Sequence, residues 1–172
     1  MVLATVLLLL LPLLAMQVTD GVTWTAADFL VAGTLLAGAG CMYVLAASHA
    51  RTPLYRAAVG VALGAALFLV WVNLAVGVIG TERNRANLMY LGVLAVGFVG
   101  ALMARLRPRG MARALFATAL AQALVAAIAL TLGLGSPESE PLEVVGVNGL
   151  FVALFIGSAM LFRSAAREKL PA

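Results

Sequence analysis

The feature that most constrains this chain is a series of six long apolar runs separated by short polar breaks. A bilayer core about 30 Å thick is crossed by roughly 20 apolar residues in helical conformation. Each run approaches that length, and a helix satisfies its own backbone hydrogen bonds inside lipid. The sequence therefore predicts an all-α integral membrane helical bundle, with six transmembrane helices in a single transmembrane domain over residues 1–172. The expected spans are residues 2–18, 28–48, 57–79, 86–106, 111–134 and 144–162.

The composition of the chain supports the membrane interpretation. Apolar residues make up 64% of the 172 residues and charged residues 10%, whereas a soluble domain is roughly half apolar and about a quarter charged. So little charge cannot cover a water-facing surface. The runs also lack the alternation of apolar and polar residues that marks the strands of a membrane β-barrel. A helical membrane protein is the class that remains.

The basic residues alternate between the two sides of the expected spans. Nine of the eleven Lys and Arg residues fall in the breaks at 49–56 and 105–113 and in the segment after residue 162. Lys and Arg are retained on the cytoplasmic side of short loops. These segments therefore predict a cytoplasmic C-terminus in a bacterial inner membrane. The predicted outer side carries Arg83 and Arg85.

The first apolar run, residues 2–18, has two interpretations. It is either an uncleaved span or a signal peptide that is removed, which would leave five spans. No basic region precedes the run, and the segment Leu14–Gln17 is a poor match to the small residues of a cleavage site. We therefore expect an uncleaved span.

Asp, Glu, Lys and Arg are absent from the middle of every expected span. Proton-coupled transporters place titratable groups near the midplane and voltage sensors carry an arginine ladder, so the sequence favours neither class. Neutral amides remain at Asn73, Gln122 and Asn148. They either form interhelical hydrogen bonds or line a polar pocket, and we expect Asn73 and Asn148 at similar depth near the outer face.

The densest polar cluster follows the third span and leads into the fourth. Thr81 or Asn84 can cap the fourth helix, and Asn84 and Asn87 are three residues apart and can share one helix face. Two interpretations stay open: a well-capped hairpin at the outer interface, or an outward-facing site for binding or docking. The candidate site residues are Trp71, Asn73, Glu82, Arg83, Asn84, Arg85, Asn87 and Tyr90.

Four arginines lie around the break between the fourth and fifth spans. We expect them to contact anionic lipid headgroups, where each basic residue contributes about 1 kcal/mol. General anchoring of the topology and specific capture of an anionic lipid or of an acidic partner both fit this pattern. The residues are Arg105, Arg107, Arg109 and Arg113.

Gly60 and Gly64 form a GxxxG pair in the third span. Such pairs allow the backbones of two membrane helices to approach closely. We expect a packing face inside the bundle, and a ligand groove or a seam between copies of the chain is the alternative.

Motifs for catalysis and metal binding are absent from the sequence. It contains no GxSxG, HExxH or P-loop pattern, and one cysteine and one histidine cannot supply a Cys- or His-rich metal centre. Basic and aromatic residues do not alternate as nucleic-acid-binding surfaces require. We therefore expect no enzyme activity, no metal or other cofactor, and no nucleic-acid partner.

Two segments of the chain resemble a known group of proteins. The first is WVNLAVGVIGTE, which begins at Trp71 and is followed by ANLMY from Ala86; the second is RPRGMARALFATALAQ, which ends at Gln122. Both resemble a family of small uncharacterised bacterial multi-pass inner-membrane proteins, and the resemblance extends from Trp24 to the C-terminus. It implies an inner-membrane location, points to the same outer hairpin and implies no activity.

Three functions are compatible with these features. The leading expectation is a non-enzymatic scaffold or accessory subunit of a membrane complex, because the chain is small and carries packing motifs and one outer hairpin rich in polar residues. A small-solute or lipid transporter or channel would need an internal polar path, for which Gln122 lies at a suitable depth. A quinone- or lipid-binding module would use Trp71, Tyr90 and the glycine-rich faces. The expected partners are the lipid bilayer and either other membrane-protein subunits or further copies of this chain.

Overall fold

The computed structural model describes residues 2–19, 23–49, 52–81, 83–135 and 141–168. Every regular element in these ranges is helical, which confirms the expected all-α fold. The elements are α1 (Val2–Val18), α2 (Ala26–Ser48), α3 (Pro53–Ala75), the 3₁₀ helix η1 (Arg85–Leu88), α4 (Met89–Ala104), α5 (Pro108–Thr131) and α6 (Pro141–Arg167).

Among the described residues, five helical segments are long and apolar enough to cross a membrane: α2, α3, the continuous segment of η1 and α4, α5 and α6. α1 is apolar but shorter, with 17 residues, and its role as a sixth span stays a prediction. Large apolar side chains cover the outside of these helices; Met103 is 81% exposed and Leu120 is 72% exposed. Lipid is the solvent in which such a surface is stable, and the chain is a helical membrane protein.

The chain divides into two compact units, Met1–Leu45 and Ala46–Ala172, which we describe separately. In the first unit, α2 begins at Ala26 rather than at residue 28. The reason is a reciprocal cap: the Thr25 N–H donates to Asp28 Oδ2 at 2.7 Å, and the Asp28 N–H donates to Thr25 Oγ1 at 3.3 Å. Such a pair satisfies two backbone donors that a helix start leaves without partners.

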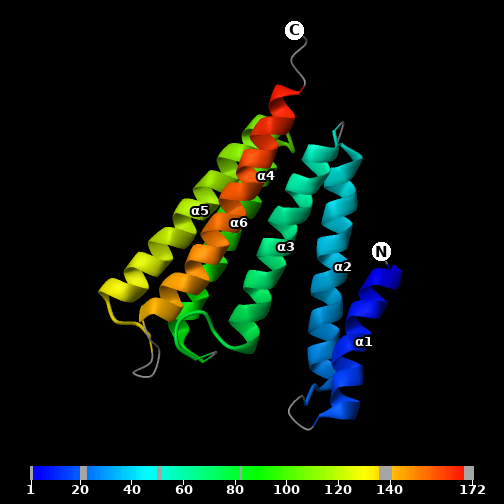
Figure 1. The fold of residues 1–172 in the computed structure, drawn as a ribbon, viewed down its shortest axis with the longest axis vertical. Coiled ribbons are helices and arrows are strands. Elements are labelled where there is room, and N and C mark those ends of the chain that lie inside the picture. Colours follow the sequence, from blue (N-terminus) through cyan, green and yellow to red (C-terminus); the bar gives the residue numbers. More distant parts are fainter. Residues whose placement is uncertain (1, 20–22, 50–51, 82, 136–140, 169–172) are drawn as a thin grey trace. The chain divides into compact units, whose positions relative to one another are not determined.

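In the second unit, α5 packs lengthwise against both α4 and α6, and α6 also packs against α3. Neighbouring helices run antiparallel in the order α4, α5, α6, α3 (Figure 1). The aromatic rings of Phe151, Phe155 and Phe162 on α6 are buried in the core. We call the end where α4 passes into α5 the arginine end, and the opposite end, where α3 leads into η1, the amide end.

The helix α3 lies about one turn earlier in the sequence than the expected span at 57–79. At its start, Thr52 Oγ1 accepts a hydrogen bond from the Tyr55 N–H at 3.3 Å. Pro53 occupies the first turn, where its missing N–H is no loss. At its end, Val76 leaves the helical conformation and Gly77 takes a φ of +83°. Capping and a left-handed glycine therefore set the bounds of α3, rather than the extent of apolar sequence.

The helices α4 and α5 approach each other through small residues. A Cβ atom placed on Gly100 would lie 2.7 Å from the Cβ of Ala114, so only glycine fits at this crossing. Gly60 and Gly64 on α3 are exposed, and a Cβ on Gly64 would meet no heavy atom within 4 Å. Close packing inside the second unit thus occurs at Gly100, and a packing role for the GxxxG pair stays a prediction.

The connection between α4 and α5 is a tight turn at the arginine end. Arg105 and Leu106 both adopt left-handed backbone conformations, with φ of 47° and 56°. The Leu106 carbonyl oxygen accepts a hydrogen bond of 2.6 Å from the hydroxyl of buried Tyr55. Because this bond joins α3 to the turn, it fixes the turn from inside the bundle.

Candidate functional site

The described part of the loop between α3 and η1, residues 76–81 and 83–84, is organised by one side chain that lies beyond it. Asn87 Oδ1 accepts hydrogen bonds from the backbone N–H groups of Val78 at 3.1 Å and Ile79 at 2.9 Å. Its Nδ2 donates to the carbonyl oxygen of Thr81 at 2.8 Å. Asn87 is buried, so these bonds close the loop from its inner side. The amide matches two backbone donors and one backbone acceptor, which neither Asp nor Leu of similar size can do.

Glycine is required where this loop leaves α3. Gly77 has a φ of +83°, and a Cβ there would lie 2.5 Å from the Thr81 carbonyl and 2.8 Å from Asn87 Nδ2. The backbone therefore passes directly over the amide that holds it. Only a residue without a Cβ permits both the left-handed turn and this close approach.

Two further asparagines attach the loop to neighbouring elements. Asn73 on α3 donates from Nδ2 to the Asn87 carbonyl oxygen at 3.1 Å. Asn84 accepts from the Ala86 N–H at 3.0 Å and so caps η1, the 3₁₀ start of the expected fourth span, whereas α4 itself begins after Leu88 without a side-chain cap. Asn84 also donates to the Leu134 carbonyl oxygen at 2.6 Å. The loop is thus joined to α3, to η1 and to the segment that follows α5.

A second polar cluster lies deeper, where three helices meet. Asn148 Oδ1 on α6 accepts hydrogen bonds of 2.9 Å from the Tyr90 hydroxyl on α4 and of 2.9 Å from Gln122 Nε2 on α5. Asn148 Nδ2 donates to the Val144 carbonyl oxygen at 2.8 Å. Tyr90, Gln122 and Asn148 are each at most 1% exposed. One asparagine therefore joins α4, α5 and α6 inside the bundle.

The orientation of the amides in this cluster follows from one carbonyl group. The Val144 oxygen can only accept, so the Asn148 amide must present its nitrogen there and its oxygen to Tyr90 and Gln122. Gln122 must then present its nitrogen to Asn148. The Gln122 Oε1 atom is left buried without a hydrogen-bond partner among the described residues, as is Asn73 Oδ1.

The structure separates the sequence-predicted candidates into two groups. Asn73, Asn84, Asn87 and Tyr90 have their side chains engaged inside the loop or the bundle. The second group consists of residues with exposed side chains, namely Trp71, Arg83 and Arg85; Glu82 lies outside the described residues.

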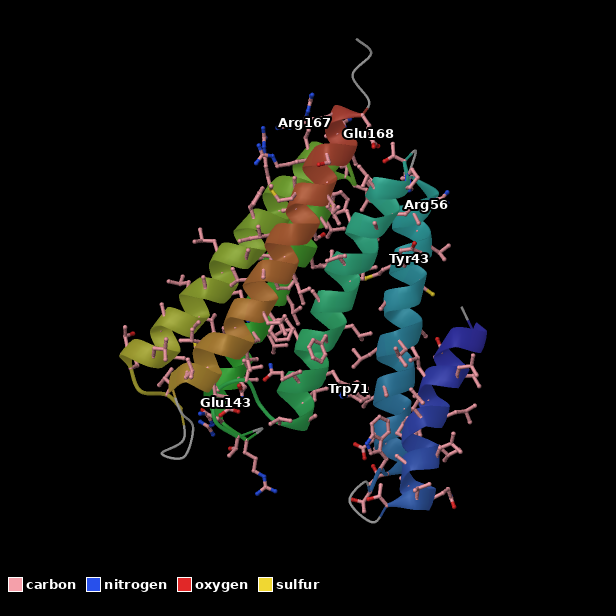
Figure 2. The ribbon with its side chains drawn as sticks, in the orientation of Figure 1. Tyr43, Arg56, Trp71, Glu143, Arg167 and Glu168 are labelled. Atoms are coloured by element: carbon pink, nitrogen blue, oxygen red, sulfur yellow. The ribbon has the colours of Figure 1, made fainter. Side chains whose placement is uncertain are left out.

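Figure 2 shows Trp71 on α3 and Glu143 at the start of α6, both toward the amide end. Asn73 and Asn148, which we expected at similar depth near the outer face, bond to different partners. The sequence did not predict that Gln122 and Tyr90 would meet at Asn148, because they lie 26 and 58 residues from it along the chain and leave no local signal. It also missed the backbone groups of Val78, Ile79 and Thr81, which carry no side-chain signature.

Comparison of the chain with protein-family models, with curated proteins and with solved structures gave no match. Among the described residues, no three His, Cys, Asp or Glu side chains lie together as metal ligands would. The candidate site therefore has to be interpreted from its own geometry: a buried network of neutral amides beneath a loop with exposed basic residues.

Proposed function

We propose that this chain is a multi-pass protein of the bacterial inner membrane, related to the family that its Trp71 and Arg107 segments resemble. It acts as a non-enzymatic accessory subunit of a larger membrane complex. It docks to its partner through the α3–η1 loop at the amide end, which faces outward, while the C-terminus lies in the cytoplasm.

The observation that carries this proposal is that backbone groups of the loop are held from its inner side, next to exposed basic residues. The Asn87 amide accepts hydrogen bonds from the N–H groups of Val78 and Ile79 and donates one to the carbonyl oxygen of Thr81. Arg83 in the loop and Arg85 at the start of η1 have exposed side chains. A loop that is ordered before binding loses little conformational entropy when a partner binds. Such a preformed, solvent-facing surface is suited to docking.

The charge of the loop supports an acidic surface on the partner. Basic residues are depleted from the outer loops of inner-membrane proteins, and Arg83 and Arg85 run against that tendency. Asn87 and Asn84 supply hydrogen bonds that hold the loop, and the side chains of both arginines are exposed. A role in recognition, where charge complementarity guides the encounter, accounts for their presence.

The alternatives receive less support from the geometry. A transporter or channel needs polar groups that are available to a solute, but buried Thr118 and Ser158 already donate to the carbonyl oxygens of Ala114 and Ala58. A quinone headgroup offers acceptor oxygens, whereas the two buried side-chain atoms that lack a hydrogen-bond partner among the described residues, Asn73 Oδ1 and Gln122 Oε1, are themselves acceptors.

Purification from native membranes in a mild detergent tests the docking proposal. The tagged wild-type chain is expected to retain a stoichiometric membrane-protein partner, which the double variant Arg83→Glu/Arg85→Glu loses. The double variant Arg83→Lys/Arg85→Lys keeps the charge and should retain the partner. Equal membrane levels of all three proteins show that folding is intact. A wild-type chain that purifies alone, or a charge-reversed chain that retains the same partner, contradicts the proposal.

A further inference from the structure

We propose that Arg109 and Arg113 on α5, together with Arg163 and Arg167 on α6, form a binding site for the phosphates of an anionic phospholipid that carries two of them, as cardiolipins do. We call these residues the arginine quartet. The inference concerns the arginine end and stands apart from the docking proposal.

The spacing within each helix places the quartet in two pairs. Arg109 and Arg113 are four residues apart on α5, and Arg163 and Arg167 are four apart on α6. Residues four apart lie on one face of a helix, one turn above the other. All four are exposed, so each pair presents two guanidinium groups to the same surroundings.

One contact brings the two pairs together. The Arg163 Cζ atom lies over the ring of Phe116 on α5, 5.9 Å from its centroid. Phe116 follows Arg113 by three residues, which makes the two neighbours on the surface of α5. Arg163 of α6 is therefore held on the α5 face that carries Arg113, along the line where the two helices pack. The cation–π contact also restrains the Arg163 guanidinium before any ligand binds.

The quartet concentrates positive charge where the second unit offers little to neutralise it. The acidic side chains that the structure describes in this unit are Glu143, at the amide end, and Glu168, next to Arg167. Figure 2 shows the Arg167 and Glu168 side chains leaving the end of α6 in different directions. Four like charges at one end of two packed helices repel one another, and a phosphate group relieves that repulsion. Arginine is also the residue best matched to phosphate, because its planar fork donates two parallel hydrogen bonds.

The surface below the quartet indicates a lipid rather than a soluble anion. On α5, Leu120 and Leu124 continue the face of Arg113 away from the arginine end and are exposed. On α6, Met160 and Ile156 continue the face of Arg163 and are also exposed. The acyl chains of a phospholipid whose phosphates lie at the arginines would pack along these exposed apolar side chains of α5 and α6. The two pairs of arginines match a headgroup with two phosphates.

The remaining arginines of this end provide a matched comparison. Arg105 is the left-handed residue that ends α4, and Arg107 is the residue before α5 begins. Both belong to the turn rather than to the faces of α5 and α6 that carry the quartet. The four arginines expected from the sequence to meet lipid together are thus divided by the structure, and the α6 pair takes the place of Arg105 and Arg107.

The test compares two double variants of equal net charge, Arg113→Gln/Arg163→Gln and Arg105→Gln/Arg107→Gln. Each full-length protein is purified in a mild detergent and titrated with cardiolipin, phosphatidylglycerol, phosphatidylcholine or inorganic pyrophosphate, and bound lipid is counted by native mass spectrometry. Each basic residue near a lipid surface contributes about 1 kcal/mol, so the quartet variant should bind cardiolipin about thirtyfold more weakly. The turn variant should bind it as the wild type does.

Three results overturn the proposal. Equally weakened cardiolipin binding in both double variants indicates general charge attraction, and unchanged cardiolipin binding in the quartet variant shows that these arginines form no site. Competition of pyrophosphate with cardiolipin identifies a soluble phosphate as the ligand. Should the quartet variant fail to fold, Arg113→Lys/Arg163→Lys replaces it. That variant keeps the charge but loses the bidentate fork, so weaker cardiolipin binding supports the site and unchanged binding overturns it.

Discussion

Single asparagines hold the amide end together: Asn87 bonds to backbone groups of the loop, and Asn148 bonds chiefly to neutral side chains of two other helices. Asn87 saturates two N–H groups and one carbonyl group of the loop. Asn148 accepts from two helices and donates within its own. Both amides are buried, where a polar group left without a partner is costly. The specificity of these positions for asparagine follows from the mixture of donors and acceptors around them.

Replacing Asn87 with alanine tests the role of this residue in the loop. The change leaves the buried N–H groups of Val78 and Ile79 without their acceptor, so the free energy of unfolding should fall by about 3 kcal/mol. Reversible unfolding by SDS in mixed micelles measures it. The control is Arg85→Ala on the exposed side of the same segment, which should change stability by less than about 0.5 kcal/mol. Similar losses for both variants would show that Asn87 does not close the loop.

In the cluster of Tyr90, Gln122 and Asn148, we expect substitutions at Asn148 and Gln122 to change stability by different amounts. Asn148→Leu leaves the Tyr90 hydroxyl and the Gln122 amide nitrogen without their hydrogen-bond acceptor and should lower the free energy of unfolding by about 2 kcal/mol. Gln122→Leu removes one interhelical bond, worth about 0.6 kcal/mol, but also removes the buried oxygen that lacks a partner, so its net effect should be close to zero. The same unfolding assay ranks the two variants. A larger loss for Gln122→Leu would contradict the network.

The sequence predicted part of this residue-scale picture. The cap at Asn84 was predictable because Asn before a helix start is a local signal. The burial of Asn87 was not, because its partners are backbone groups placed by the left-handed turn at Gly77. The convergence of Tyr90, Gln122 and Asn148 depends on how three helices pack, which hydropathy does not specify.

At the scale of elements, close approach between helices is set by single glycines. Gly100 on α4 faces Ala114 of α5, and a Cβ would bring the two side chains to 2.7 Å. Gly92 lies on the same helix, and a Cβ there would meet no heavy atom within 4 Å. The two glycines lie on the same helix, but a side chain at position 100 would clash with α5 and a side chain at position 92 would enter open space.

These two glycines give a matched pair of substitutions. Gly100→Val should force α4 and α5 apart and lower the free energy of unfolding by about 2 kcal/mol, as overpacked cores do. Gly92→Val should leave the free energy of unfolding nearly unchanged. Unfolding in SDS mixed micelles measures both, and equal effects would mean that helix propensity rather than the crossing explains the loss.

The helical type of the apolar elements, and five of the six expected spans, followed from hydropathy, because a run of suitable length has one stable conformation in lipid. Their bounds were less predictable, as the shift of α3 shows. The glycine pair at Gly60 and Gly64 matched the best-known packing pattern, yet the close crossing formed at Gly100. A GxxxG pattern shows where two helices can approach and does not identify the partner.

At the scale of the whole molecule, charge separates the two ends of the second unit. The arginine end carries the quartet and the turn arginines, and the amide end carries Glu143 and the loop with Arg83 and Arg85. The division was predictable from the sequence because the breaks between apolar runs alternate in basic content. The pairing of α5 with α6 arginines was not, since it depends on the Arg163–Phe116 contact between distant segments.

Cysteine labelling tests the orientation that this charge distribution predicts. Cys41 is the single cysteine, so a Cys41→Ser background accepts one new thiol at a time. A membrane-impermeant maleimide should label Thr81→Cys in intact spheroplasts and should label Ser164→Cys only after the membrane is permeabilised. The opposite pattern would place the amide end in the cytoplasm and would contradict docking at the outer face.

The most direct test of the docking account is site-specific photo-cross-linking from the loop in native membranes. A photoreactive phenylalanine derivative at position 81 replaces an exposed side chain while leaving Arg83, Arg85 and the Asn87 network unchanged. The same group at position 91, where the exposed leucine lies on α4, serves as a lipid-facing control. We predict one discrete membrane-protein adduct from position 81 that disappears with Arg83→Glu/Arg85→Glu and does not form from position 91. The absence of any protein adduct from position 81, or the same adducts from both positions, would contradict it.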